Sequence, residues 1–200
     1  MRVFNSVNDT EVVNLIKGGA VGFMQTDTVY GLVCSAKDPQ AVKRLYILKD
    51  RVHKPGTIIA ANIDQLISLG IKRRYLSAVQ QFWPNPISIE IPHAIAYLNQ
   101  DTGRQALRVI KGNRDLLKLL DKVGPLLTSS ANQPGEPPAN NLYEGQEYFN
   151  ESIDFYVDSG DLSNQKPSTL IRIIDDSVEI LREGAIKVTE SGEVVNSESK

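Results

Sequence analysis

The sequence has few of the residues that mark disulfide-rich, metal-binding or membrane proteins. It holds one cysteine, Cys34, and two histidines, His53 and His93, in 200 residues. A single cysteine excludes a disulfide framework and a cysteine-rich zinc site, and it fits a reducing compartment. No apolar run approaches the length of a membrane span, and Asn5 and Asn8 stand where a secretory signal would be apolar. We therefore expect a cytoplasmic protein without a membrane segment.

An excess of positive charge is also lacking. Lys and Arg number 22 against 24 for Asp and Glu, which gives a net charge of −2. This balance provides no overall attraction to nucleic acid, so any such contact has to come from a local patch. The basic residues are not interleaved with aromatic ones in the way that is typical of base stacking.

Several catalytic motifs are absent as well. The sequence contains none of G-x-x-x-x-G-K-[ST], G-x-G-x-x-G, H-E-x-x-H and G-x-S-x-G. The two histidines lack the spacing of metal ligands, so we interpret both as surface residues and expect no protein-held metal. Cys34 has no base near it in the sequence and is interpreted as a buried thiol. Covalent catalysis therefore has little support.

What is present is an alternation of helix and strand signals in a chain of one-domain length. Apolar spacing and capping residues predict helices over 9–18, 38–48, 62–69, 76–82, 116–120 and 140–149. Short apolar or alternating runs predict strands over 20–24, 57–61, 87–91, 106–110, 126–127, 153–157, 169–174 and 178–181. In the strand over 87–91, Ser88 and Glu90 alternate with isoleucines, which predicts an exposed polar face. The fold class is α/β, a mixed β-sheet with flanking helices.

A polar loop follows the strand that ends at Leu127. Residues 128–132 read Thr-Ser-Ser-Ala-Asn, and the prolines and glycine of residues 134–138 prevent a strand or helix from continuing. Small polar side chains at a strand end are typical of a ligand-binding rim in an open α/β sheet. The alternative is a turn whose Ser and Asn side chains bond only their own backbone.

A second loop carries three cations. Lys49, Arg51 and Lys54 follow the helix predicted over 38–48, in a segment with Pro55 and Gly56. Such a loop suits polyphosphate, because Arg offers a bidentate fork and Lys a point charge. The alternative is that these residues only complement the dipole at a helix C-terminus.

Other polar residues complete a possible site. Arg108 lies inside an apolar strand and needs a carboxylate or phosphate partner, because an unpaired buried charge is costly. Thr28 belongs to a polar loop over 25–31, and Ser168 and Arg182 belong to two further polar segments. Together these residues supply hydroxyls and cations without a nucleophile, which suits nucleotidyl transfer by positioning and charge stabilisation.

Seven motifs run in order along nearly the whole chain, from about residue 5 to residue 187: Thr26-Asp27-Thr28-Val29-Tyr30-Gly31-Leu32, Lys49-x-Arg51, Trp83-Pro84-x-Pro86, Leu107-Arg108-Val109, Ser130-Ala131-Asn132, Pro167-Ser168-Thr169 and Leu181-Arg182-x-Gly184-Ala185-Ile186. In this combination they resemble the YrdC-like threonylcarbamoyl-AMP synthase family in its single-domain form.

The resemblance implies a twisted α/β sheet with a concave, positively charged face. It implies a YrdC-like catalytic domain over residues 1–187, followed by a polar tail over 188–200 that we expect to be disordered. The implied reaction makes threonylcarbamoyl-AMP and pyrophosphate from L-threonine, bicarbonate and ATP, with Mg²⁺. A separate threonylcarbamoyl transferase complex would then modify adenosine beside the anticodon of tRNA, and direct binding of tRNA is left open.

The resemblance also assigns roles to residues. Threonine would be held by Thr28, Arg108, Thr128 and Ser168. ATP would be surrounded by Lys49, Arg51, Lys54, Ser130, Asn132 and Arg182, of which Lys49 and Arg51 would be catalytic. No general base is implied, because the carbamate formed from threonine and bicarbonate can itself attack the α-phosphorus.

The sequence departs from the family pattern near this loop. Val52 stands where a Pro commonly follows Arg51, and the loop as far as Thr57 is slightly shorter, so the assignment of Lys54 depends most on the loop's shape. Gln25 and Val33 also replace the usual Pro and Gly.

Two other functions stay open. One is a non-catalytic RNA-binding module on the same fold, which would use the cations Lys43, Arg44, Lys72, Arg73, Arg74, Lys111 and Arg114 for phosphates. The other is a paralogue that acts on a different acceptor.

Overall fold

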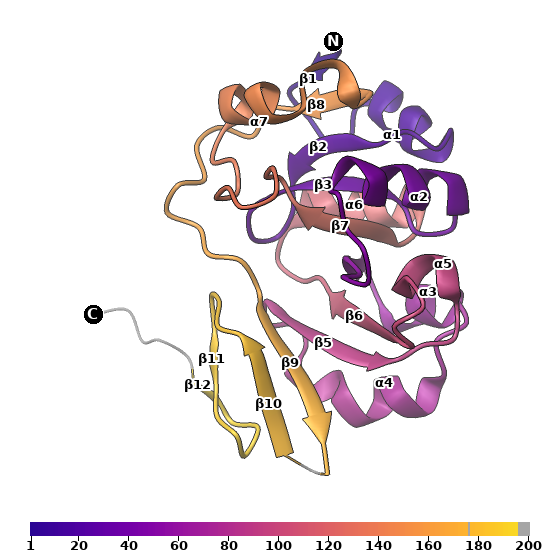
Figure 1. Cartoon of the computed structure of the whole chain (residues 1–200), viewed down its shortest axis with the longest axis vertical. Coiled ribbons are helices and arrows are strands. Elements are labelled where there is room, and N and C mark those ends of the chain that lie inside the picture. The colour runs from indigo at the N-terminus through magenta and orange to yellow at the C-terminus, as the bar shows by residue number, and fades with distance from the viewer. Residues whose placement is uncertain (176, 196–200) are drawn as a thin grey trace.

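A mixed sheet of ten strands forms the centre of the computed structural model, which describes residues 1–175 and 177–195. The strand order is β1-β8-β2-β3-β7-β4-β6-β5-β9-β10, and Figure 1 shows it running from β1 and β8 at the top to β9 and β10 at the bottom. Four neighbouring pairs are parallel, β1 with β8, β2 with β8, β4 with β6 and β5 with β9, and the others are antiparallel. The predicted α/β class with a mixed sheet is confirmed. The strands are β1 (Val3–Phe4), β2 (Gly22–Gln25), β3 (Tyr30–Ser35), β4 (Thr57–Ala60), β5 (Ile87–Pro92), β6 (Arg104–Val109), β7 (Leu126–Ser130), β8 (Phe155–Val157), β9 (Thr169–Ile174) and β10 (Ser177–Arg182).

The helices begin where the sequence places capping side chains. Asp9 accepts a hydrogen bond from the backbone of Glu11, and Asp38 accepts one from Gln40, so both predicted starts are confirmed. The helices are α1 (Thr10–Lys17), α2 (Pro39–Leu48), α3 (Ile63–Ile67), α4 (Arg73–Val79), α5 (Ala96–Asn99), α6 (Arg114–Val123) and α7 (Leu142–Phe149). In the described residues, no helix combines the length and apolar character that a membrane crossing requires.

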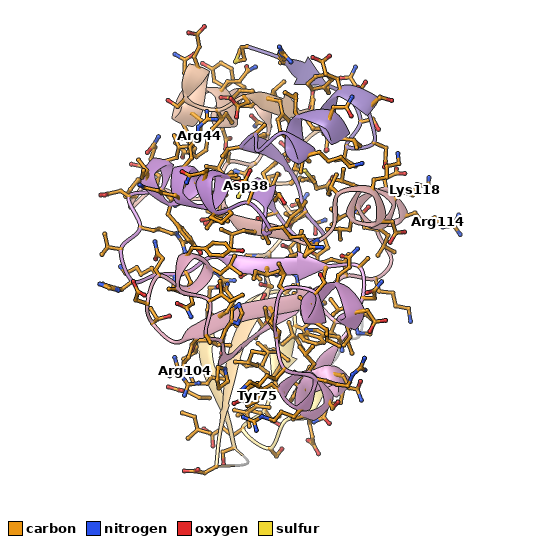
Figure 2. The ribbon with its side chains drawn as sticks, turned by 90° about the vertical axis from the view of Figure 1, so that its right-hand side faces the viewer. Asp38, Arg44, Tyr75, Arg104, Arg114 and Lys118 are labelled. Atoms are coloured by element: carbon orange, nitrogen blue, oxygen red, sulfur yellow. The ribbon has the colours of Figure 1, made fainter. Side chains whose placement is uncertain are left out.

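Two apolar cores lie on opposite faces of the sheet. Successive strand residues point to opposite faces, and Leu126 belongs to one core while Leu127 belongs to the other. The core around Leu126 contains the buried residues of α1 and α6. The core around Leu127 contains those of α2, α3, α4 and α5, and Figure 1 shows these four helices together on the right-hand side of the sheet. Figure 2 shows where Arg44 of α2, Tyr75 of α4, and Arg114 and Lys118 of α6 lie.

Strand β3 is the main element that the sequence did not predict. Tyr30 and Gly31 were expected in a polar loop, but they begin a strand that pairs with β2 on one side and β7 on the other. Tyr30 to Cys34 are all buried, so the strand lacks the alternation of apolar and polar residues that reveals a half-buried strand. Cys34 is a fully buried thiol as expected, and desolvation raises its pKa.

The expectation of a disordered tail is wrong for the part of 188–200 that the structure describes. Strand β11 (Lys187–Val188) pairs with β12 (Val194–Val195), and the turn between them is closed by a hydrogen bond from the Glu193 backbone to the Thr189 hydroxyl at 3.0 Å. Val188 is buried in the core, which fixes this hairpin to the sheet. Residues 196–200 of the predicted tail lie outside the described residues, as does Asp176, which falls between the strands predicted over 169–174 and 178–181.

The two histidines differ from each other. His53 is exposed, as expected, but His93 is only 6% exposed, so its interpretation as a surface residue is wrong. Asn99, the last residue of α5, donates from its side chain to the His93 carbonyl at 2.6 Å, and the His93 N–H donates to the Gly103 carbonyl at 2.9 Å. Burial lowers the pKa of His93.

Candidate active site

A cavity of about 330 Å³ opens on the face of the sheet that carries α1 and α6. Side chains two residues apart along a strand share a face. On β3, Val33 packs in the core with these helices and Gly31 continues the row into the cavity. On β7, Leu126 packs in the same core, and Thr128 and Ser130 continue into the cavity. The strands therefore extend past the helices, and the uncovered ends form the floor of the cavity.

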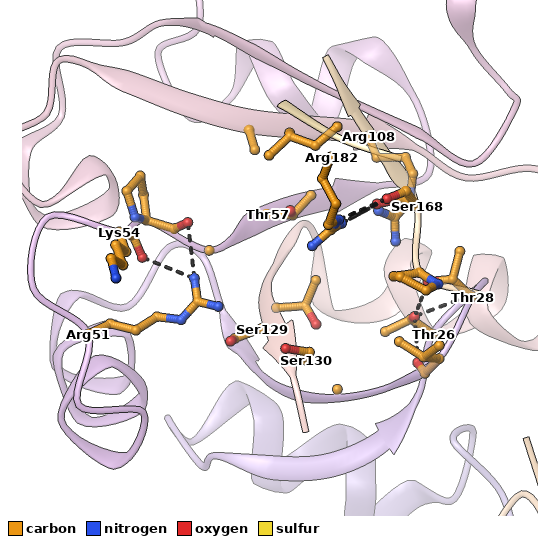
Figure 3. Close-up of a pocket in the computed structure, with 18 of the residues that line it drawn as sticks. Thr26, Thr28, Arg51, Lys54, Thr57, Arg108, Ser129, Ser130, Ser168 and Arg182 are labelled. Carbon is orange, nitrogen blue, oxygen red and sulfur yellow. Dashed lines mark hydrogen bonds between the residues drawn. The ribbon is translucent and has the colours of Figure 1, made fainter. Parts of the chain in front are cut away.

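Most of the predicted site residues meet in this cavity. Its lining includes Thr28, Arg51, Lys54, Arg108, Thr128, Ser130, Ser168 and Arg182. Figure 3 shows Arg51 and Lys54 on one side, and Arg182, Ser168 and Thr28 on the other. Segments far apart in the sequence thus converge as predicted, while the role of each residue stays a prediction.

The cations Arg51 and Lys54, on one side of the cavity, belong to the loop that follows α2. The Arg51 guanidinium donates through Nη1 to the carbonyl oxygens of Lys54 at 3.1 Å and Pro55 at 3.4 Å. These bonds fold the side chain across its own loop and point it toward the cavity, as Figure 3 shows. Desolvation lowers the pKa of Arg51, although an Arg side chain stays protonated in proteins.

Arg108 has the carboxylate partner that its buried position requires. It is 3% exposed, and it donates through Nε and Nη2 to the two carboxylate oxygens of Asp27 at 2.9 and 2.6 Å. Nη1 donates to the Ser88 hydroxyl at 2.7 Å. A guanidinium has five N–H groups, so these bonds leave donors on Nη1 and Nη2 for a further acceptor. A ligand carboxylate could therefore bind Arg108 without displacing Asp27.

A chain of polar contacts joins Arg108 to Arg182. The Ser88 and Ser168 hydroxyls lie 2.9 Å apart, and Arg182 donates through Nη2 to the Ser168 carbonyl at 2.8 Å and to its hydroxyl at 3.2 Å. Desolvation lowers the pKa of Arg182, and the positive charges of Arg108 and Arg51 lower it further. The cavity therefore concentrates positive charge and favours an anionic ligand.

Hydroxyl groups form the wall between β2 and β3. Thr26 closes the turn there, with its hydroxyl donating to the Val29 carbonyl at 2.8 Å and lying 3.2 Å from the Thr28 hydroxyl. Gly31 has no side chain at a point where a Cβ atom would lie 2.6 Å from Thr128 Oγ1. Only glycine leaves Thr128 in its place, which explains a glycine in this strand.

Lys49 directly follows α2 as predicted, but it is a buried helix cap and does not belong to the part of the loop that faces the cavity. Lys49 is the C-cap residue of α2 and is 5% exposed, and its ammonium nitrogen lies 6.0 Å from the centroid of the Phe149 ring. Its ammonium group donates to the backbone oxygen of Asn132 and, at 2.9 Å, to Asn132 Oδ1, which also accepts from the Ser130 hydroxyl at 2.7 Å. Neither Lys49 nor Asn132 lines the cavity, so these two lie behind Ser130 in this conformation. Desolvation lowers the pKa of Lys49 to about 8, with a further contribution from the charge of Arg51.

Sequence reasoning missed Asp27, Ser88 and Ser129 as site residues. The demand of Arg108 for a carboxylate was the only signal for Asp27, and no spacing or motif connects two residues that are 81 positions apart. Ser88 was expected on an exposed face, but that face borders the cavity and Ser88 is fully buried. The Ser129 residue lines the cavity, and its hydroxyl has no hydrogen-bond partner among the described residues. No sequence signal distinguished Ser129 from its neighbours.

The described residues offer no group of three or more His, Cys, Asp or Glu side chains that could hold a metal ion. Of the carboxylates, Glu90 lines the cavity and is paired with Arg172. Mg²⁺ commonly binds through substrate phosphates and water, so it can enter such a site with its nucleotide. The arrangement as a whole can bind a polyanion beside a small polar molecule and stabilise charge that develops between them.

Comparisons with known proteins agree with this description. A model of the Sua5/YciO/YrdC family, described as telomere recombination, matches residues 14–184. A threonylcarbamoyl-AMP synthase of Pseudomonas syringae is 34% identical over 175 residues, which cover 84% of this chain and 93% of that protein. A second such synthase, from Stutzerimonas stutzeri, is 32% identical over 169 residues, 81% of this chain and 90% of that protein.

Solved structures are similar in fold. The crystal structure of P. abyssi Sua5 complexed with L-threonine matches 93% of this chain with a TM-score of 0.80 and 25% identity. This chain spans 58% of the length of that protein. The structure of E. coli YciO matches 92% of this chain and 94% of its own with a TM-score of 0.75, and at 20% identity this likeness concerns the fold alone.

Proposed function

The chain belongs to the Sua5/YciO/YrdC family, and from this membership we propose that it makes threonylcarbamoyl-AMP and pyrophosphate from L-threonine, bicarbonate and ATP. The observation that carries the proposal is the cavity itself, where Arg51 and Lys54 face a group of hydroxyls and Arg108. One side suits a triphosphate and the other suits an amino acid. The name of the synthases at 32–34% identity supports the same reaction.

The chemistry would need no nucleophile from the protein. The amine of threonine adds to bicarbonate with loss of water and gives a carbamate. A carbamate oxygen then attacks the α-phosphorus of ATP, the bond to the bridging oxygen breaks, and pyrophosphate leaves with its electron pair. The protein would supply alignment of the two reactants and stabilisation of phosphate charge, which can account for large rate enhancements.

Threonine would lie among Thr28, Arg108, Thr128 and Ser168. The donors left on Arg108 Nη1 and Nη2 suit its carboxylate, while Asp27 and Ser88 hold the guanidinium in place. Thr28, Thr128 and Ser168 are 3–6% exposed and supply hydroxyls for the hydroxyl and amine of the substrate. The complex of P. abyssi Sua5 with L-threonine supports this choice of amino acid.

ATP would bind along Arg51, Lys54, Ser130 and Arg182, which line the cavity. Lys49 and Asn132 would act on it through Ser130, or after a shift that opens their mutual hydrogen bonds. Mg²⁺ would be carried by the phosphates, since the described residues hold no cluster of metal ligands.

The wider setting is part of the proposal. The product is a mixed anhydride that another enzyme must consume, so a separate threonylcarbamoyl transferase complex would use it to modify adenosine beside the anticodon of tRNA. We place this chemistry in the cytoplasm, where ATP and tRNA are available. The paralogue alternative has the same site with another acceptor amine in place of threonine.

The test is pyrophosphate release measured with purified protein, ATP and Mg²⁺, with threonine and bicarbonate omitted in turn. We expect release only when both are present, and threonylcarbamoyl-AMP as the product identified by mass spectrometry. Release that needs bicarbonate and a different amine would support the paralogue, and absence of release under all conditions would refute the proposal.

A further inference from the structure

The turn that follows α5 lies against the loop that presents Arg51 and Lys54. Helix α5 is followed by its C-cap residue Gln100, whose backbone is left-handed with a φ of 50°. This conformation is uncommon for a residue with a side chain. It turns the chain so that both the main chain and the side chain of Gln100 face residues 51–54.

Three hydrogen bonds connect Gln100 to this loop. Its side-chain Nε2 donates to the Arg51 carbonyl at 2.7 Å, and its Oε1 accepts from the Lys54 backbone N–H at 2.8 Å. The Gln100 carbonyl oxygen lies 3.0 Å from Nδ1 of His53. The side-chain amide thus satisfies one acceptor and one donor of the loop backbone, as a neighbouring strand would.

The loop needs an external partner at this point. Asp50 and His53 both have positive φ values, 45° and 54°, which cost free energy in residues other than glycine. The ends of the loop are fixed elsewhere: the Arg51 N–H donates to the Tyr46 carbonyl, and Gln105 donates to the Gly56 carbonyl at 2.6 Å. Among the described residues, Gln100 is the side chain from outside the loop that bonds the backbone between these ends, and the Arg51 side chain bonds it from within.

The position of the Arg51 guanidinium depends on the same bonds. Its Nη1 donates to the carbonyl of Lys54, and Gln100 holds the N–H of that same residue. If the backbone at Lys54 moves, the guanidinium loses the shorter of its two bonds to the loop, and both cations shift from their places in the cavity lining.

We propose that Gln100 is a positioning residue that holds the 51–54 loop in the shape that presents Arg51 and Lys54 to a polyphosphate. The identity of that ligand as ATP rests on the proposed function, but the clamp itself does not. It belongs to a region far from the loop in sequence, and neither spacing nor motif indicated it.

The experiment compares Gln100→Ala, Gln100→Glu and the control Thr102→Ala. Thr102 lies in the same turn and donates to the carbonyls of Asn99 and Arg104 at 2.7 and 3.0 Å, so its substitution removes a side-chain group of the turn but no hydrogen bond to the loop. Three quantities are measured: hydrogen exchange at the Lys54 amide, the Kd of inorganic pyrophosphate, and KM for ATP and for threonine.

For Gln100→Ala we expect the hydrogen-exchange rate of the Lys54 amide and the Kd of pyrophosphate each to rise about tenfold. A tenfold change corresponds to the loss of one hydrogen bond of about 1.4 kcal/mol. KM for ATP should rise with the Kd while KM for threonine stays within a factor of two. Gln100→Glu keeps an acceptor for Lys54 but places a carboxylate against the Arg51 carbonyl, so we expect a protected amide and a weakened Kd. Thr102→Ala should match the wild type in all three.

The outcomes separate the two proposals. Unchanged exchange and an unchanged Kd in Gln100→Ala would overturn the clamp, as would equal effects of Gln100→Ala and Thr102→Ala. If exchange and Kd change as expected but no variant, wild type included, releases pyrophosphate from ATP, the clamp stands and the proposed reaction fails.

Discussion

Lys49 holds a positive charge in a place that is closed to solvent. It is 5% exposed, and desolvation lowers the pKa of its ammonium group to about 8 from an ordinary 10.5. In the unfolded chain the group keeps its proton up to the higher value. Between these two pH values the unfolded state therefore binds more protons than the native state, and the stability contributed by this residue rises with pH.

This predicts a specific difference between the wild type and Lys49→Gln, which cannot titrate. As pH rises from 8 to 10.5, the unfolding free energy of the wild type should increase relative to the variant by up to about 1.4 kcal/mol per pH unit. Urea unfolding of both proteins at intervals across this range measures the difference, because other titrating groups cancel. Parallel curves would mean that the hydrogen bonds to Asn132 offset the desolvation of Lys49.

For single residues, the sequence predicted the kind of partner that a side chain requires more accurately than it predicted where the side chain lies. It predicted that Arg108 requires an anionic partner, since a buried guanidinium cannot stay unpaired. It could not indicate Asp27 as that partner, because the two residues are 81 positions apart and meet only through the pairing of β3, β7, β4 and β6. Lys49 was misplaced for a related reason: a lysine at a helix end is usually exposed, and here the surrounding fold covers it.

Among the elements, the sequence was reliable where a local cause fixes the structure. Asp9, Asp38 and Asn62 cap helices with their own side chains, so the starts of α1, α2 and α3 could be read directly. Strand β3 and the hairpin of β11 and β12 depend on burial against distant residues, and no local pattern reveals that. Ser88 illustrates both points, because its strand was predicted correctly and its environment was not.

The close approach of two segments gives a prediction at this scale. A Cβ atom on Gly184 would lie 2.3 Å from the Pro167 carbonyl oxygen and 2.4 Å from the backbone carbon of Ser168. In Gly184→Ala the backbone at Ser168 must move, and the bonds between Ser168 and Arg182 must break or lengthen. We expect a loss of about 1–3 kcal/mol in unfolding free energy from overpacking. A displacement of about 1 Å at Ser168 should also lower kcat/KM for threonine about a hundredfold.

The matched control is Gly18→Ala at the C-cap of α1, where the nearest atom is the Asn14 carbonyl oxygen at 3.3 Å. Neither residue of that pair lines the cavity. Steady-state kinetics and urea unfolding of both variants give the comparison. If Gly184→Ala and Gly18→Ala have the same kcat/KM for threonine, then the exact position of Ser168 does not matter for the reaction.

At the scale of the whole molecule, the cations that line the cavity contrast with the negative net charge of the chain. The chain has a net charge of −2, while the cavity lining holds Arg51, Lys54, Arg108 and Arg182. Two cations outside it are engaged with neighbouring side chains: Arg73 pairs with Asp64 at 3.3 Å, and Arg74 lies 4.7 Å from the centroid of the Tyr75 ring. Figure 2 shows Arg44, Arg104 and Arg114 at separate places on that side of the molecule.

This distribution predicts strong binding of a small polyanion and weak binding of a long one. Non-specific RNA binding depends on many simultaneous phosphate contacts, with an affinity that falls steeply as salt rises. We expect filter binding of tRNA to be weaker than about 10⁻⁵ M at physiological salt. Pyrophosphate binding should weaken in Arg51→Ala but not in the double variant Arg73→Ala, Arg74→Ala. The RNA-binding alternative predicts the reverse: tight, salt-sensitive binding of tRNA, its loss in the double variant, and no release of pyrophosphate from ATP. Results of this second kind would show that tRNA binds the outer surface of the protein, and the proposed role of the cavity in binding ATP would then be wrong.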